Sequence, residues 1–291
     1  MSAQRRELAK RALEKALEVR ETADFDDESP ICVYELCEKM KIRVQFAALA
    51  SMEGTYIAGV RPQIYLSSLR PLGRRAFTCG HEVGHHVFGH GSAIDELRKE
   101  DEANPVFKPD EFLVDAFSGF LLMPQVGVRN AFRVRGWNIR AASPEQVFTV
   151  ACNFGVGYEA LANHLGYSIN EISPIRVQEL GRMKLPTIRR SILGHPSDRP
   201  LIVADRDFRR PTLDAEVGTQ ILLPAGVVAD SPSLGLLEDL PGGRLFQAGK
   251  PSLVRVHDPN SAWAIIVRIA RFQYEGLARY RHVEEEEGDD E

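Results

Sequence analysis

The stretch His81-Glu82-Val83-Gly84-His85 places two histidines four residues apart, inside a segment that reads as a helix over residues 74–89. Side chains at positions i and i+4 lie on one face of a helix, so both imidazoles can reach a single metal ion. Glu82 then lies beside the ion, where its carboxylate can take a proton from a water held at the metal. The motif therefore predicts a hydrolytic metal centre with His81 and His85 as ligands and Glu82 as the general base.

A third protein ligand is expected on a second helix, over residues 110–123. Glu111 and Asp115 are four apart there and share a face, so one carboxylate can bind the ion while the other accepts an imidazole N–H. Glu111 is the better candidate for the ligand. The alternative is that both acids form a solvated helix face near the helix N-terminus. The metzincin class is excluded, because the chain lacks the Gly and His that its longer motif requires after His85.

A peptidase also needs a group that stabilises the oxyanion formed during attack on the carbonyl. Four side chains near the motif have suitable chemistry, and the sequence does not choose among them: Tyr56, Tyr65, His86 and His90. His86 lies about 100° around the helix from His85, so we do not expect it to bind the same ion.

The rest of the first half alternates short helices and strands. Residues 2–20 carry an amphipathic pattern, and Ser29-Pro30 are expected to begin a second helix that runs to Lys39. Strands are expected at 42–46 and within 55–69, and a polar loop at 91–109.

Residues 144–166 fit a helix-turn-helix, with apolar residues that can pack the two helices and glycines near the turn. The body of the second helix has no Lys or Arg, whereas helices that read DNA rely on basic or amide side chains. Arginines before and after the unit can form a phosphate-binding patch or an ordinary solvated surface. A structural or partner-docking role is therefore favoured, and direct DNA binding stays open.

From residue 190 onward the pattern changes to strand-like runs between Pro/Gly turns, at 200–204, 220–223, 253–257 and 262–272. These runs indicate a separate α/β domain. The last eight residues hold seven acids, a pattern typical of a disordered, solubilising tail.

With 291 residues, 44 % of them hydrophobic and 26 % charged, the chain has the composition of a globular protein with more than one domain. The N-terminal residues are charged throughout and no apolar run approaches the length of a membrane span, so a cytoplasmic protein without membrane association is expected. The four cysteines lack zinc-ligand spacing and are expected to be free thiols.

The motif and its flanks resemble the ImmA/IrrE family of metallopeptidases. The resemblance rests on three stretches, Ile64–Leu69, Arg75–His90 and Glu111–Pro124, the last of which ends in Leu-Leu-Met-Pro. The chain departs from the commoner family pattern ExEAN, because Leu113 replaces the second Glu and Asp115 replaces the Asn.

This resemblance implies a gluzincin-like fold in which His81, His85 and Glu111 hold zinc, with manganese or another divalent metal as alternatives, and Glu82 is the base. It also implies a helix-turn-helix transcriptional repressor as the substrate, cut at one site to derepress DNA-damage genes. For the C-terminal domain it implies a GAF-like sensor fold that binds a small molecule or responds to a signal. The alternative is a domain that stabilises or dimerises the protein.

The sequence thus predicts an α+β multidomain protein. Its predicted parts are a mainly helical, zincin-like (gluzincin-like) peptidase domain with a small sheet at 1–143, a helix-turn-helix unit and linker at 144–185, a C-terminal α/β GAF-like domain at 186–283 and the acidic tail at 284–291. The predicted function is a zinc-dependent regulatory endopeptidase. The alternative is a DNA-binding or ligand-sensing transcription regulator whose peptidase-like domain does not cut.

Overall fold

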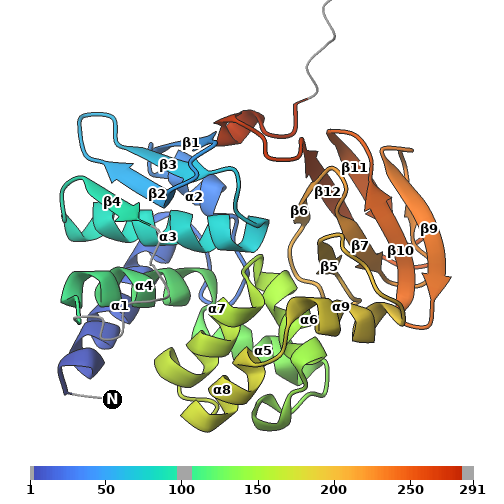
Figure 1. Cartoon of the computed structure of the whole chain (residues 1–291), viewed down its shortest axis with the longest axis horizontal. Coiled ribbons are helices and arrows are strands. Elements are labelled where there is room, and N and C mark those ends of the chain that lie inside the picture. Colours follow the sequence, from blue (N-terminus) through green and yellow to red (C-terminus); the bar gives the residue numbers. More distant parts are fainter. Residues whose placement is uncertain (1–2, 97–106, 284–291) are drawn as a thin grey trace, which may run out of the picture.

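The computed structural model describes residues 3–96 and 107–283, and its elements fall into three groups in space (Figure 1). The N-terminal helices and their sheet, in blue to green, lie on one side. The C-terminal strands, in orange, lie on the other, and a group of helices in green to yellow lies below. The predicted acidic tail and most of the predicted loop at 91–109 lie outside the described residues.

The first group packs helices on a five-stranded sheet. Its helices are α1 (Ala3–Thr22), α2 (Val33–Lys39), α3 (Leu72–Phe88) and α4 (Pro109–Leu122), and its strands are β1 (Arg43–Ala47), β2 (Met52–Ile57), β3 (Gln63–Ser67), β4 (Ala93–Glu96) and β13 (Gly276–Leu277). The strand order is β13-β1-β3-β2-β4, with β1 parallel to β3 and β2 antiparallel to both of its neighbours. The helices predicted at 2–20, 74–89 and 110–123 are confirmed to within two residues at either end.

The second helix begins at Val33, so the prediction that it starts at Ser29-Pro30 is wrong. The main chain of Ser29 is engaged outside a helix, because its N–H donates to Asp26 and its carbonyl accepts from the buried guanidinium of Arg20. Arg20 also donates to the carbonyl of Leu121 at 2.6 Å, so it joins α1 to the end of α4 and keeps residues 26–29 as a loop. The loop predicted at 91–109 is corrected at its start, where β4 pairs with β2.

Helices α3 and α4 approach closely because α3 presents glycines to α4. A Cβ at Gly80 would lie 2.5 Å from Ser118 Oγ, and a Cβ at Gly84 would lie 2.8 Å from the Cβ of Val114. The Ser118 hydroxyl donates to the carbonyl of Phe77 at 2.8 Å, which adds a polar link between the two helices. This close packing sets the distance between side chains on the two helices.

The second group is helical. It consists of α5 (Gln125–Val134), the 3₁₀ helix η1 (Ile139–Ala141), α6 (Pro144–Phe154), α7 (Tyr158–Asn163), the π-helix η2 (His164–Ser168), α8 (Pro174–Gly181) and α9 (Leu185–Leu193). Ser143 caps α6 with a reciprocal bond to Gln146, and Gly155 ends it in the left-handed conformation, so α6 and α7 are joined by a tight turn. The buried apolar residues of these helices belong to the same continuous core as those of α1 to α4.

The third group is a pair of four-stranded sheets. One has the order β5 (Leu201–Val203), β7 (Gln220–Leu223), β10 (Gly243–Ala248), β9 (Leu234–Leu240), and the other has the order β6 (Thr212–Glu216), β12 (Ala264–Ala270), β11 (Ser252–His257), β8 (Val228–Ala229). A second apolar core lies between them, with Ile221 and Phe246 from the first sheet and Val256 and Val267 from the second. We call this group the two-sheet unit.

The α/β domain predicted at 186–283 includes helix α9, but strands and no α-helix are found among its described residues from Leu201 to Leu277. The outer face of the first sheet is nevertheless covered. Its residues Leu222 and Leu245 belong to the large core shared with the helical group, and β5 contacts α6. The helical layer over this sheet is thus supplied by an earlier part of the chain, and a GAF-like fold is not confirmed.

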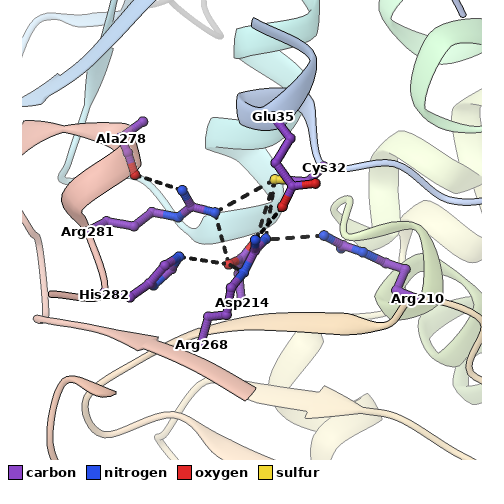
Figure 2. Close-up of polar contacts among 8 residues, drawn as sticks. All are labelled: Cys32, Glu35, Arg210, Asp214, Arg268, Ala278, Arg281 and His282. Atoms are coloured by element: carbon purple, nitrogen blue, oxygen red, sulfur yellow. Dashed lines mark hydrogen bonds and ion pairs between the residues drawn. The ribbon is translucent and has the colours of Figure 1, made fainter. Parts of the chain in front are cut away.

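Buried ion pairs join the two-sheet unit to the first group, as Figure 2 shows around Asp214. Asp214 on β6 accepts hydrogen bonds from Arg268 on β12 at 2.8 and 2.9 Å and from Arg281 at 3.1 Å. Arg268 also donates to Glu35 on α2. Burial alone would raise the pKa of Asp214, but Arg281, Arg268 and Arg210 together hold that pKa far below its ordinary value.

No single helix among the described residues is long and apolar enough to cross a membrane. Helices α4 and α5 reach that length and composition together, but they are bent by 44° at a break and contribute buried residues to the core.

Candidate metal centre

Helices α3 and α4 bring His81, His85 and Glu111 together. The Nε2 atoms of His81 and His85 are 3.1 Å apart, and the carboxylate oxygens of Glu111 lie 3.6 Å from the first and 3.9 Å from the second. Both histidines are buried and Glu111 is half-buried, so the group is open on one side.

These distances fit a divalent metal ion. Ligand bonds of about 2.0–2.2 Å at tetrahedral angles place donor atoms about 3.3–3.5 Å apart, close to the separations found here. Two imidazole nitrogens and one carboxylate oxygen form a donor set that zinc accepts, and manganese and iron accept it as well. The geometry therefore agrees with the predicted ligand set of His81, His85 and Glu111.

Asp115 lies one turn after Glu111 and holds the first histidine. The Nδ1–H of His81 donates to Asp115 Oδ1 at 2.9 Å. This bond fixes the tautomer of His81 and leaves the lone pair of its Nε2 facing His85 and Glu111. The structure thus places Asp115 where the sequence predicted a partner for a ligand histidine.

His90 lies behind the second histidine. Its Nδ1 is 3.1 Å from Nδ1 of His85, and its Nε2 is 3.9 Å from a carboxylate oxygen of Asp110. His90 was a candidate oxyanion stabiliser, but this contact makes it a support for a ligand. Burial, followed by the neighbouring imidazoles of His81 and His90, lowers the pKa of His85 to about 4, so at neutral pH the ring is in the uncharged form that binds metal.

Glu82 is fully buried on the face of α3 that meets the sheet. Opposite it on β2 is Gly54, where a Cβ would lie 3.1 Å from Glu82 Oε1 and 2.8 Å from Cγ2 of Thr78. The missing side chain at position 54 therefore makes room for the carboxylate. Gly54 is a site residue that was not predicted from the sequence, although a glycine inside a strand pattern is a signal of close approach.

Tyr56 and His86 form a pair beyond Glu82. His86 is four residues after Glu82 and shares its helix face, and the Tyr56 hydroxyl lies 2.8 Å from His86 Nδ1. Burial lowers the pKa of His86 and raises the pKa of Tyr56, so both side chains are neutral at pH 7. Two of the four oxyanion candidates are thus brought together on the side of α3 that carries the base.

Tyr65 is not brought to the centre. In the sheet it pairs with Thr55, whereas its neighbour Ile64 pairs with Tyr56, so Tyr65 points to the face of the sheet away from Tyr56. Its hydroxyl donates to Gln63 at 3.2 Å. Its candidacy as an oxyanion stabiliser is therefore corrected by strand alternation.

A cleft of about 1070 Å³ reaches the centre at His81 and Asp115. Phe77 and Phe112 line it beside these residues, and residues of the helical group and the two-sheet unit line the rest. Its volume is slightly above the range of about 300–1,000 Å³ found for small-molecule pockets. The cleft therefore gives a ligand access to the His81 side of the centre.

Comparison with known families agrees with this geometry. Residues 37–165 match the model of the peptidase M78 family, described as an IrrE N-terminal-like domain, and all of the site residues above lie within that segment. A search of curated proteins found no match. The family match covers less than half of the chain, and it supports assigning residues 37–165 to the metallopeptidases of the ImmA/IrrE family.

Proposed function

We propose that this protein is a zinc-dependent regulatory endopeptidase of the ImmA/IrrE kind. The observation that carries the proposal is the convergence of His81, His85 and Glu111, with the buried carboxylate of Glu82 on the same helix. A structural zinc site uses four protein ligands, whereas three gather here among the described residues, which leaves a position for water and substrate. The family match at 37–165 supports the same choice.

The chain's own residues have distinct parts in this reaction. A bound zinc ion supplies a Lewis acid toward the peptide carbonyl. Glu82 takes a proton from the attacking water and delivers it to the leaving amine. Asp115 holds the ring of His81 in a fixed orientation. Tyr56, with His86 behind it, is our candidate for the oxyanion stabiliser, because its hydroxyl lies on the side of α3 that carries Glu82.

The substrate we propose is a helix-turn-helix transcriptional repressor, cut at one site so that DNA-damage genes are derepressed. This part rests on the family resemblance and on the order of the three parts of the chain, which resembles the Deinococcus radiation-response regulator IrrE. The attachment of the two-sheet unit supports regulation over digestion. Its Glu216 pairs with Arg75 in the first turn of the motif helix at 2.5 Å, so a change in that unit can reach α3 directly.

The test is incubation of the purified, zinc-loaded protein with a co-encoded helix-turn-helix repressor. We expect one defined cut, abolished by a chelator and by Glu82→Gln, which keeps the shape of the side chain but removes the base. Glu14→Gln, at an exposed position on α1, is the matched control and is expected to cut normally. Cleavage by Glu82→Gln at the normal rate would disprove the mechanism.

The alternative, a regulator that acts without cutting, makes the opposite prediction for cells. If it is correct, cells that carry Glu82→Gln show the full damage response. Its DNA-binding form has little support, because α7, the helix that would read DNA, has no Lys or Arg and exposes the acidic Glu159.

A further inference from the structure

The turn between α6 and α7 is held between the motif helix and the two-sheet unit. A Cβ at Gly73, in the first turn of α3, would lie 2.6 Å from the carbonyl carbon of Val156 and 2.7 Å from the nitrogen of Gly157. On its other side the guanidinium of Arg210 passes within 2.2 Å of the place a Cβ would take at Gly155. The turn is therefore enclosed and is not available to a duplex.

The far end of α7 is fixed to α4. His164, the first residue of the π-helix η2, donates from Nε2 to the carbonyl of Met123 at 2.8 Å. A Cβ at Gly119 would lie 2.8 Å from its Nδ1. Helix α7 is thus attached at its start to the helix that carries the histidines and at its end to the helix that carries Glu111, so its distance from the metal centre is fixed at both ends.

The face that α7 and η2 leave exposed lines the cleft. It consists of Glu159, Asn163 and Tyr167, which follow one another at intervals of four residues. Tyr167 is 44 % exposed. Phe77 on α3 and Phe112 on α4 line the same cleft. π-Helical turns are rare and often occur at functional sites, and this one places Tyr167 on the cleft side.

Charged side chains in the cleft are largely neutralised by the protein itself. Glu53 pairs with Arg70 at 3.2 Å and with Arg74 at 2.8 Å. Glu216 pairs with Arg75, and Asp214 is bound by arginines. Glu159, exposed on α7, adds a negative charge that disfavours an acidic ligand, whereas aromatic and apolar side chains would find contacts with Phe77, Phe112 and Tyr167.

We propose that α7 and η2 form the substrate-binding wall of the metal centre and contact an uncharged, apolar segment of the polypeptide substrate. This inference rests on the proposed function, since it takes the cleft beside His81 as the place where the polypeptide lies. It gives the helix pair a role in recognising a protein rather than DNA. The substrate is then a protein that presents an apolar segment to the cleft.

The test measures binding apart from cleavage. Full-length protein with Glu82→Gln is titrated against two fluorescein-labelled peptides of equal length and net charge, one with a Leu/Phe/Ala centre and one with a Ser/Asn/Gln centre, and anisotropy is recorded. We expect saturable binding of the apolar peptide, weakened about tenfold by Tyr167→Ala, as is typical of an aromatic anchor. Tyr167→Phe is expected to bind normally.

Tyr280→Ala is the matched control, because Tyr280 is 49 % exposed but does not line the cleft. Equal affinity for the two peptides, no saturable binding, or equal loss in Tyr167→Ala and Tyr280→Ala would overturn the proposal. If the apolar peptide does not bind as expected but the repressor is cleaved normally, only the proposed binding wall is rejected. Normal peptide binding without any repressor cleavage would reject the proposed function instead.

Discussion

Substituting Gly80 by alanine should disturb the metal centre through a contact that does not touch the metal ligands. The added Cβ would lie 2.5 Å from Ser118 Oγ, about 0.9 Å closer than the 3.4 Å at which ordinary contact begins. Ser118 is completely buried and its hydroxyl donates to the carbonyl of Phe77, so it cannot turn away without losing that bond. Either α4 moves away from α3, or a buried hydroxyl loses its partner.

The magnitude follows from opposing effects. Overpacking or loss of the buried hydrogen bond costs about 1–3 kcal/mol. Alanine in a helix interior stabilises by about 1 kcal/mol relative to glycine. We therefore expect Gly80→Ala to lower the free energy of unfolding by up to about 2 kcal/mol. If α4 moves, Glu111 moves away from His81 and His85, and zinc affinity should fall by about ten- to a hundredfold, as it does when a supporting residue is lost.

The double variant Gly80→Ala/Ser118→Ala isolates the contact. Without the Ser118 hydroxyl, the nearest atoms to the new Cβ are Cβ of Ser118 and Cδ1 of Leu122, both at 3.4 Å. The double variant should therefore recover the cost of the contact, about 1–3 kcal/mol, relative to the sum of the single variants, and most of the zinc affinity. Urea unfolding and zinc competition against a chromophoric chelator measure both. Additive losses in the double variant would refute the argument.

Three further predictions concern ionisable groups. Burial lowers the pKa of His164 to about 4, so the unfolded chain binds more protons than the folded protein between pH 4 and 6.5. The free energy of unfolding should therefore fall by up to about 3 kcal/mol as the pH drops through that window. His164→Gln should lack this part of the pH dependence, and an equal pH dependence of unfolding in the two proteins would contradict the lowered pKa of His164. Asp214→Asn leaves buried Arg281 without its carboxylate partner and Arg268 with Glu35 alone, and it should destabilise by about 3–5 kcal/mol in urea unfolding. A change within experimental error would show that the cluster does not stabilise the fold. Asp115→Asn should weaken zinc binding about ten- to a hundredfold with little loss of stability, and unchanged affinity would exclude its support of His81.

The metal centre was predictable because it depends on one local regularity. In a helix, residues four apart share a face whatever the rest of the protein does, so His81 with His85, and Glu111 with Asp115, follow from spacing alone. The position of Tyr65 depends instead on which face of a strand meets α3. That face is set by the pairing of β3 with β2, and neighbouring residues on a strand point to opposite sides. Nothing local distinguished Tyr65 from Tyr56.

The C-terminal half was predicted less well because the burial of its strands depends on segments elsewhere in the chain. β9 contains Glu238 and Asp239 at the edge of its sheet, so its sequence lacks the alternation of a half-buried strand. β7 is buried along its whole length because helices of the preceding group cover the sheet on one face and the second sheet covers the other. Strand-like runs between Pro/Gly turns suggested a separate α/β domain, whereas the helices that cover its first sheet belong to the preceding group.

The core that surrounds the metal centre extends beyond residues 37–165, the segment that matches the family. The match starts at residue 37, yet Ala12 and Ala16 of α1 are buried in the same core as α4, and Arg20 donates to the carbonyl of Leu121. The match ends at residue 165, inside the π-helix that is fixed to α4 through His164. The segment that carries the chemistry is therefore shorter than the unit that holds it in place. The two helices that bear the ligands are positioned by α1 on one side and by α7 with η2 on the other, so a change in either flank reaches the metal centre through packing alone.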